Sequence, residues 1–224
     1  MSSNNNPQVP FFRQDWFRYV FPFVVFMLLT EVQATFSGSL LFCLYALKSA
    51  IVGGLLYALF KGRKAEFPGS FHWMTLVLGT LGFLVWIGIG NFLHTDTEIT
   101  FNPEIFSEKW QFWLAVLART AGAVLVVPVM EELLWRSFAM RYIIDEKFSS
   151  IEIGAWNPKA FWITVILFTV VHVPADWPAC VLYGIMIGYW VVKTKNLVGA
   201  MYIHAVTNLL LAAYVVATGN YFYW

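Results

Sequence analysis

The sequence contains about seven apolar runs that are long enough, or nearly long enough, to cross a lipid bilayer. A bilayer core needs about 20 mostly apolar residues in each helix that spans it. We expect the helices to cover residues 17–36, 39–60, 73–93, 110–144, 159–173, 179–192 and 197–218. The sequence therefore predicts an all-α fold, a polytopic membrane helix bundle with about seven transmembrane helices.

Composition supports a membrane protein and gives no reason to invoke nucleic acid. Hydrophobic residues make up 59% of the chain and charged residues 12%, and the formal net charge is +1. Soluble domains average about 45–50% apolar and about 25% charged residues. We expect the lipid bilayer as a partner and a single membrane-embedded domain over residues 1–224, with 1–15 as a disordered or surface-lying tail. Cys43 and Cys180 lie in apolar runs, so we interpret them as inert packing residues.

Basic residues collect in the loops on one side of the predicted bundle. These residues are Arg13 and Arg18, Lys61, Arg63 and Lys64, Arg136, Arg141 and Lys147, and Lys193 and Lys195. The opposite side receives an acidic loop over residues 94–108. Because lysine and arginine favour cytoplasmic loops, we expect a cytoplasmic N-terminus and an external C-terminus.

The fourth run carries two carboxylates and an arginine, Glu131, Glu132 and Arg136. A charged side chain at membrane depth costs roughly 2.5–3.5 kcal/mol on insertion scales, so such residues are expected to pair or to do chemistry. Glu132 and Arg136 are four residues apart and can form an ion pair on one helix face. Glu131 points about 100° away and is left without a local partner. The run is too long for one straight crossing, so either its first turns lie in the interface or Pro128 kinks it.

Two more polar clusters lie at membrane depth, His172 at the end of the fifth run and His204 with Asn208 in the last. If the clusters converge, Glu131 is placed to act as a general base and the histidines and amide to orient water or stabilise an oxyanion. Structural interpretations remain open, because Glu132 with Arg136 can be a plain ion pair and His204 with Asn208 an interhelical hydrogen-bond clasp. Lys48 and Arg119 have no assigned role, although Arg119 is a candidate counter-charge for the carboxylates.

These residues resemble the type II CAAX prenyl protease family, also called the CPBP or Abi family of intramembrane endopeptidases. Its motifs are two adjacent glutamates followed by three variable residues and an arginine, a phenylalanine four residues before a histidine, and a histidine four residues before an asparagine or aspartate. All three occur here in order, as Glu131, Glu132 and Arg136, then Phe168 and His172, then His204 and Asn208. The short chain resembles the branch linked with exosortase systems in Gram-negative bacteria.

The resemblance implies hydrolysis of a peptide bond in a membrane-anchored or lipidated protein, within a bacterial inner membrane. By that likeness, Glu131 and His172 would activate the water, His204 and Asn208 would form the oxyanion pocket, and Glu132 and Arg136 would hold the helix in place. A zinc ion would take Glu131, His172 and His204 as ligands. The sequence has no His-Glu-x-x-His pair on one helix, and we expect catalysis without a metal cofactor.

Two other functions remain open at the level of sequence. The chain could be a non-catalytic membrane scaffold or an immunity-type protein that keeps the family fold and binds a partner. It could also be a small transporter with a proton-titrating intramembrane carboxylate. An unpaired glutamate at membrane depth favours the protease, because a scaffold has no physical need for one.

Overall fold

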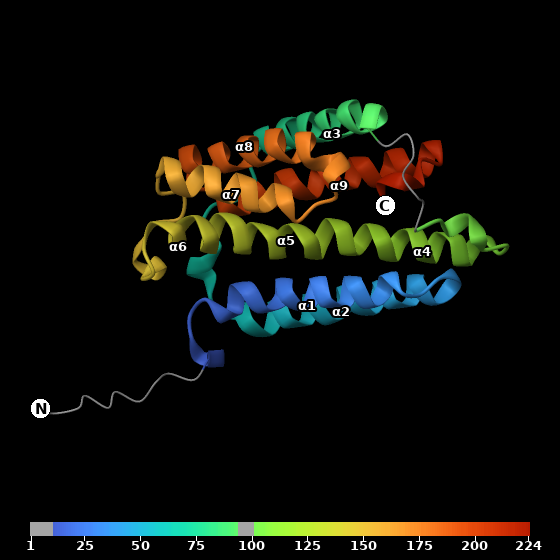
Figure 1. The fold of residues 1–224 in the computed structure, drawn as a ribbon, viewed down its shortest axis with the longest axis horizontal. Helices are drawn as coiled ribbons and strands as arrows, with labels where there is room; N and C mark the ends of the chain where they lie inside the picture. Colours follow the sequence, from blue (N-terminus) through green and yellow to red (C-terminus); the bar gives the residue numbers. More distant parts are fainter. Residues whose placement is uncertain (1–10, 94–100) are drawn as a thin grey trace, which may run out of the picture.

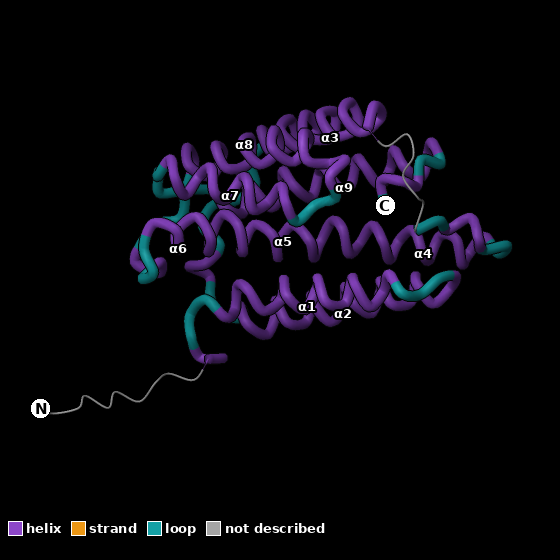
Figure 2. The backbone as a smooth tube through the Cα atoms, viewed as in Figure 1, coloured by secondary structure: helices purple, strands orange, loops and turns teal. Residues whose placement is uncertain are grey.

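The computed structural model describes residues 11–93 and 101–224, and within these ranges every regular element is a helix (Figures 1 and 2). The α-helices are α1 Phe17–Ala34, α2 Gly38–Phe60, α3 Met74–Leu93, α4 Lys109–Ala121, α5 Val127–Glu132, α6 Met140–Ile144, α7 Pro158–Val170, α8 Trp177–Thr194 and α9 Leu197–Thr218. The predicted all-α bundle is confirmed. Residues 1–10 of the expected tail and the start of the acidic loop, including His94, lie outside the described ranges, whereas Phe11–Arg13 is a short 3₁₀ helix.

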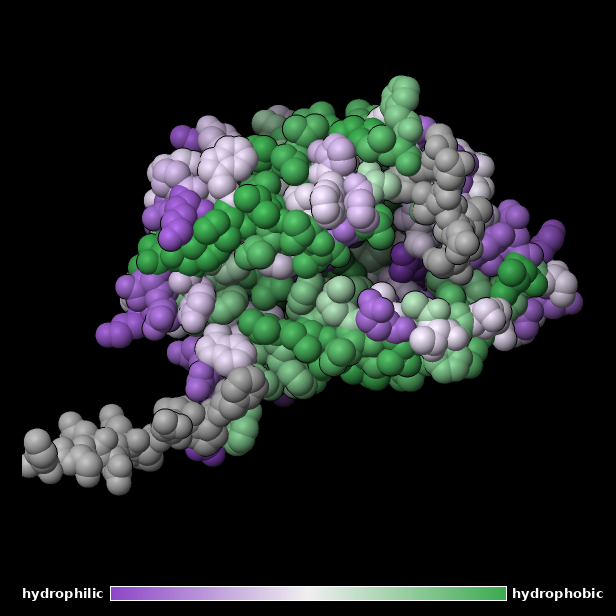
Figure 3. Space-filling view, viewed as in Figure 1, coloured by the Kyte–Doolittle hydropathy of each residue, from purple (hydrophilic) through white to green (hydrophobic). Residues whose placement is uncertain are grey.

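Six helices are long and apolar enough to cross a membrane, and α7 is the shorter seventh. The expected span 159–173 was too long, because α7 ends at Val170 after 13 residues, which is about 20 Å of helix against the ~30 Å of a bilayer core. By contrast, α8 is longer than the expected 179–192. Apolar side chains occupy the middle of the face shown in Figure 3, and hydrophilic ones gather at its two ends, as expected of a multi-pass membrane protein.

One helical rod from Lys109 to Ile144 forms the centre of the bundle, with α1 and α2 on one side and α3, α7, α8 and α9 on the other (Figure 1). The rod is continuous, but two segments have π-helical hydrogen bonding, 122–126 and 133–139. The first lies directly before Pro128, whose missing N–H leaves a carbonyl of the preceding turn unbonded. Pro128 therefore stands beside a wide turn rather than at a break in the helix.

Small residues allow close approach where the bundle is tightest. A Cβ added at Gly79 of α3 would lie 2.6 Å from the Val206 side chain and 2.9 Å from the Ile203 carbonyl oxygen. The Thr207 hydroxyl donates to the Gly79 carbonyl at 2.9 Å, so α3 and α9 are joined by contact and by a hydrogen bond. Such small-residue contacts are typical of helix packing in membranes.

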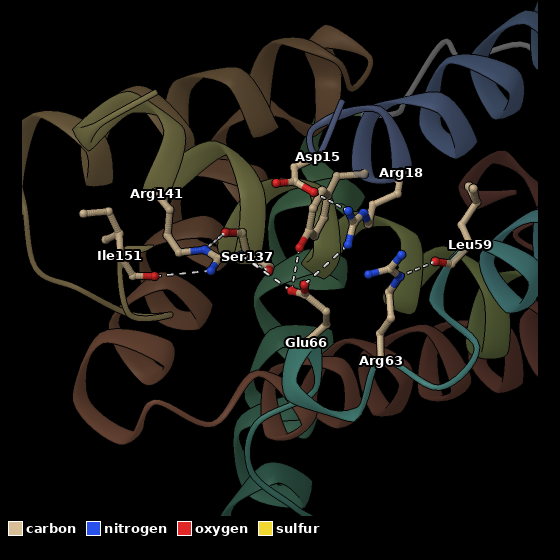
Figure 4. A network of polar contacts seen from close by, with 9 residues as sticks. Asp15, Arg18, Leu59, Arg63, Glu66, Ser137, Arg141 and Ile151 are labelled. Carbon is tan, nitrogen blue, oxygen red and sulfur yellow. Dashed lines mark hydrogen bonds and ion pairs between the residues drawn. The ribbon is translucent and has the colours of Figure 1, made fainter. Parts of the chain in front are cut away.

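A polar network joins the start of α1, the turn after α2 and the end of the central rod (Figure 4). The Glu66 carboxylate accepts from the Tyr19 hydroxyl at 2.5 Å and pairs with Arg18 at 3.9 Å and Arg141 at 3.8 Å. Arg141 also donates to the Ser137 hydroxyl at 2.9 Å. These contacts fix the end of the rod that carries Arg136.

Candidate active site

Glu132 is held by two partners at the centre of the bundle. Its Oε1 accepts from the Arg136 guanidinium at 3.1 Å, which is the ion pair expected from the spacing, and lies 3.0 Å from Nδ1 of His204 on α9. The side chain of Glu132 is fully buried and that of Arg136 is 2% exposed. Because a carboxylate accepts, His204 Nδ1 carries a proton and leaves Nε2 for other partners. Glu132 therefore joins the rod to α9.

Glu131 has a different environment from its neighbour. It is 7% exposed, and its Oε2 is buried without a hydrogen-bond partner among the residues that the structure describes. A buried carboxylate oxygen without a donor is costly, and such groups are concentrated at functional sites.

His172 lies in the turn after α7, where the shortness of that helix places it within the thickness of the bundle. Its Nδ1 lies 2.7 Å from the Phe168 carbonyl oxygen, so Nδ1 donates and Nε2 is left as the basic nitrogen. The rings of Phe168 and His172 are 4.7 Å apart. The Arg136 guanidinium lies 4.7 Å from the centroid of the same Phe168 ring, which links His172 to the Glu132 ion pair.

Two aromatic residues that sequence reasoning missed connect the two histidines. Tyr183 of α8 packs on His204 with ring centroids 5.6 Å apart. Trp86 of α3 lies 5.9 Å from Tyr183 and 6.0 Å from His172. In the sequence, Tyr183 and Trp86 are a tyrosine and a tryptophan within apolar runs. Membrane spans commonly use both residue types for packing and interfacial anchoring, so the sequence did not mark them as part of a site.

Asn208 faces the central rod from α9, as expected from its spacing to His204. Its amide nitrogen donates to the Ala123 carbonyl at 2.7 Å, within the first π-helical segment. One amide N–H of Asn208 is thus used to join α9 to the rod. Arg119 does not serve the carboxylates, because its guanidinium lies 4.4 Å from the Tyr45 ring centroid and 5.2 Å from that of Phe101.

The three candidate zinc ligands do not form a metal cluster. Throughout residues 11–93 and 101–224, no three His, Cys, Asp or Glu side chains are gathered closely enough to hold an ion. The Nδ1–H groups of His172 and His204 do donate hydrogen bonds to a carbonyl and a carboxylate, as the second ring nitrogens of metal-bound histidines do. Because Glu131, His172 and His204 do not converge as a set of ligands, we derive no catalytic step through a metal.

Comparison with known families places all seven motif residues in one matched segment. Residues 109–210 match the family described as type II CAAX prenyl endopeptidase Rce1-like. The matched segment begins with the first residue of the central rod and ends within α9, whereas α1, α2 and α3 lie outside the match. Neither a curated protein nor a solved structure gave a match.

The family match over residues 109–210 and the six long apolar helices together support an integral, multi-pass membrane protein. A family of CAAX endopeptidases acts on membrane-anchored protein substrates. The resemblance inferred from the motifs is therefore confirmed. The exosortase-associated branch, the bacterial inner membrane and the orientation of the N-terminus stay predictions.

Proposed function

We propose that this protein is an intramembrane endopeptidase that hydrolyses a peptide bond of a membrane-anchored or lipidated protein, with Glu131 as the base that activates water. The observation that carries the proposal is the difference between two adjacent carboxylates. Both carboxylates keep a buried Oε2 without a donor, but Glu132 is paired with Arg136 and bonded to His204 through Oε1, whereas Glu131 makes no hydrogen bond or ion pair to a residue that the structure describes. A water molecule could occupy the position of that missing donor.

In the proposed reaction, Glu131 takes a proton from water while the water oxygen bonds to the scissile carbonyl carbon. The carbonyl becomes a tetrahedral oxyanion. The proton held by Glu131 then passes to the amide nitrogen, the carbon–nitrogen bond breaks, and an amine and a carboxylic acid leave. General base and acid catalysis of this kind contributes about 10²–10⁴-fold to the rate.

We assign His172 to the water, because its basic Nε2 is free while Nδ1 is bonded to the Phe168 carbonyl. The second N–H of Asn208 can donate to the oxyanion, since its one donor contact to a described residue is with the Ala123 carbonyl. The Nδ1–H of His204 donates a hydrogen bond to Glu132, so its Nε2 can donate to an oxyanion only when the ring is an imidazolium. Glu132 and Arg136 keep their assigned role of holding the helix.

The proposal is tested by comparing new protein C-termini in membranes of cells that carry the wild-type protein or Glu131→Gln. The expected result is at least one membrane protein whose shortened form disappears with Glu131→Gln. The matched control is Glu31→Gln, which makes the same change at an exposed glutamate of α1 and should leave that product in place. Identical C-termini in all three membranes, with Glu131→Gln folded by size-exclusion chromatography, would refute the proposal and favour the scaffold or immunity-type alternative.

We also propose that hydrolysis proceeds without a metal cofactor. Once a cleaved substrate is known, its cleavage by the purified protein should be unaffected by a zinc chelator. Loss of cleavage on chelation, with recovery on adding zinc and one zinc bound per chain, would show instead that Glu131, His172 and His204 come together around an ion.

A further inference from the structure

A polar cavity lies between α1, α2 and α4, away from the candidate active site. Its volume is about 410 Å³, and its walls include Gln33, Ser37, Lys48, Phe101 and Arg119. Arg119 stands 12 residues before Glu131 on the central rod, which is about 18 Å of helix. The cavity is therefore a separate site from the one that holds the catalytic candidates.

Two cations, Lys48 and Arg119, line this cavity without an aspartate or glutamate of the described chain to balance them. Lys48 is 4% exposed, and its ammonium donates to the Thr30 hydroxyl at 2.9 Å. Arg119 leaves a buried Nε without a hydrogen-bond partner. Both cations lie over the Tyr45 ring, at 4.9 Å and 4.4 Å from its centroid, and their like charges repel each other. In the described parts of the chain, no aspartate or glutamate lines the cavity or pairs with either cation.

Such a pair is costly unless an anion completes it. Buried charges in membrane proteins usually pair with one another or line a pathway, and here like charges are brought together instead. The aromatic rings of Tyr45, Phe26 and Phe101 stabilise the cations through their faces but carry no net charge. Gln33, which is 8% exposed, adds a carbonyl oxygen without a donor. The cavity therefore offers cationic donors and one acceptor with no partner in the described chain.

The two cations are directed toward the membrane surface. A helical side chain leans toward the N-terminal end of its helix. Lys48 of α2 and Arg119 of α4 therefore lean toward the end of the bundle at which both helices begin. The cavity includes the α1–α2 turn at that end, through Ser37 and Gly38. Thr30, the partner of Lys48, lies four residues before the last residue of α1, about 6 Å along the helix. The Lys48 ammonium thus lies near the end of α1, where a long basic side chain can reach the head groups of lipids.

We propose that this cavity binds the phosphate of an anionic phospholipid, held by Lys48 and Arg119. A net-anionic lipid is favoured over a zwitterionic one because the described cavity wall has two cationic side chains and no aspartate or glutamate to receive a choline or ethanolamine cation. Basic pockets between membrane helices are known sites for acidic lipid head groups. The proposal is independent of peptide hydrolysis, since it concerns residues that the catalytic assignment does not use.

The test is native mass spectrometry of the purified full-length protein from micelles containing equal amounts of phosphatidylglycerol and phosphatidylcholine. The wild-type protein should retain phosphatidylglycerol selectively. Lys48→Gln with Arg119→Gln should lower that selectivity by about tenfold or more, because two charge-assisted hydrogen bonds are lost. Lys109→Gln with Lys159→Gln removes the same charge from exposed positions and should keep the selectivity.

Three results would overturn the proposal. One is a wild-type protein with no preference for phosphatidylglycerol, which needs no variant and so decides the question even if the double substitution does not fold. A second is equal loss of selectivity in the two double variants, which would indicate a general charge effect. The third is displacement of the lipid by millimolar inorganic phosphate, which would indicate a site for small anions instead of a lipid site.

Discussion

Removing Arg136 should destabilise the protein more than removing Arg136 and the charge of Glu132 together. Arg136→Met leaves the Glu132 carboxylate buried with only His204 as a partner. Glu132→Gln leaves the guanidinium buried over Phe168 without its counter-ion. The double substitution leaves neither charge, and a methionine can fill much of the space of the arginine stem.

The structure sets the size of the effect. The two charged groups are 3.1 Å apart with side chains 2% and 0% exposed, and at an effective dielectric constant of about 20 their attraction is about 5 kcal/mol. Breaking a buried pair from one side costs about 3–5 kcal/mol, whereas replacing both partners by neutral groups can be nearly neutral. We expect about 3 kcal/mol for Arg136→Met, because His204 still supports the carboxylate, and less than 2 kcal/mol for the double variant.

The measurement is reversible unfolding in mixed micelles with increasing denaturing detergent, followed by circular dichroism and tryptophan fluorescence. Arg63→Met is the matched control, since Arg63 is exposed and donates only to the Leu59 carbonyl in the described chain. Its effect should stay within about 0.5 kcal/mol. The reasoning is refuted if Arg136→Met is as stable as the wild type, or if the double variant loses the sum of the two single losses.

Three further predictions concern stability. Glu131→Gln should raise the free energy of unfolding by about 1–3 kcal/mol, because it removes a buried charge with an unpaired oxygen, and it should also abolish cleavage. A destabilised variant would argue against an unpaired Glu131. Gly79→Ala should cost about 1–3 kcal/mol through overpacking against α9, whereas Gly54→Ala on α2, which meets no atom within 4 Å, should cost nothing in the same unfolding assay. Glu66→Gln should lower the free energy of unfolding by about 1 kcal/mol at low salt and by less at high salt, since Glu66 is partly exposed and its ion pairs are screened. A loss of stability that does not change with salt would exclude the ionic network.

Much of the fold was predictable because hydropathy and helix length are coupled in a bilayer. The bounds of the first three helices and of the last were close to those expected. The end of α7 was not, because residues 171–173 are as apolar as a span and nothing in them indicates that the chain turns before His172. Hydropathy reports whether a residue suits lipid, and the exposed valines of this turn, Val171 and Val173, suit lipid as well as those of a helix.

The candidate site was predictable in its local part. Spacing gave the Glu132–Arg136 pair and the isolation of Glu131, because both follow from helix geometry within one segment. The bond between His204 and Glu132 joins residues 72 positions apart and depends on how α9 packs against the rod. The resemblance of the motifs to the protease family assigned His204 to the oxyanion pocket. It did not indicate that the Nδ1–H of His204 already donates to Glu132.

The two π-helical segments of the central rod also determine which way its side chains face. A π turn contains one more residue than an α turn, so each segment advances the phase of the helix as a one-residue insertion would. Arg119, which lines the proposed lipid cavity, lies before the first segment, and Glu131 lies after it. Deleting one residue between 122 and 126 would restore a uniform helix and rotate one set of side chains by about 100° relative to the other. The π-helical segment at 122–126 therefore sets how Glu131 is turned relative to the cavity that Arg119 lines.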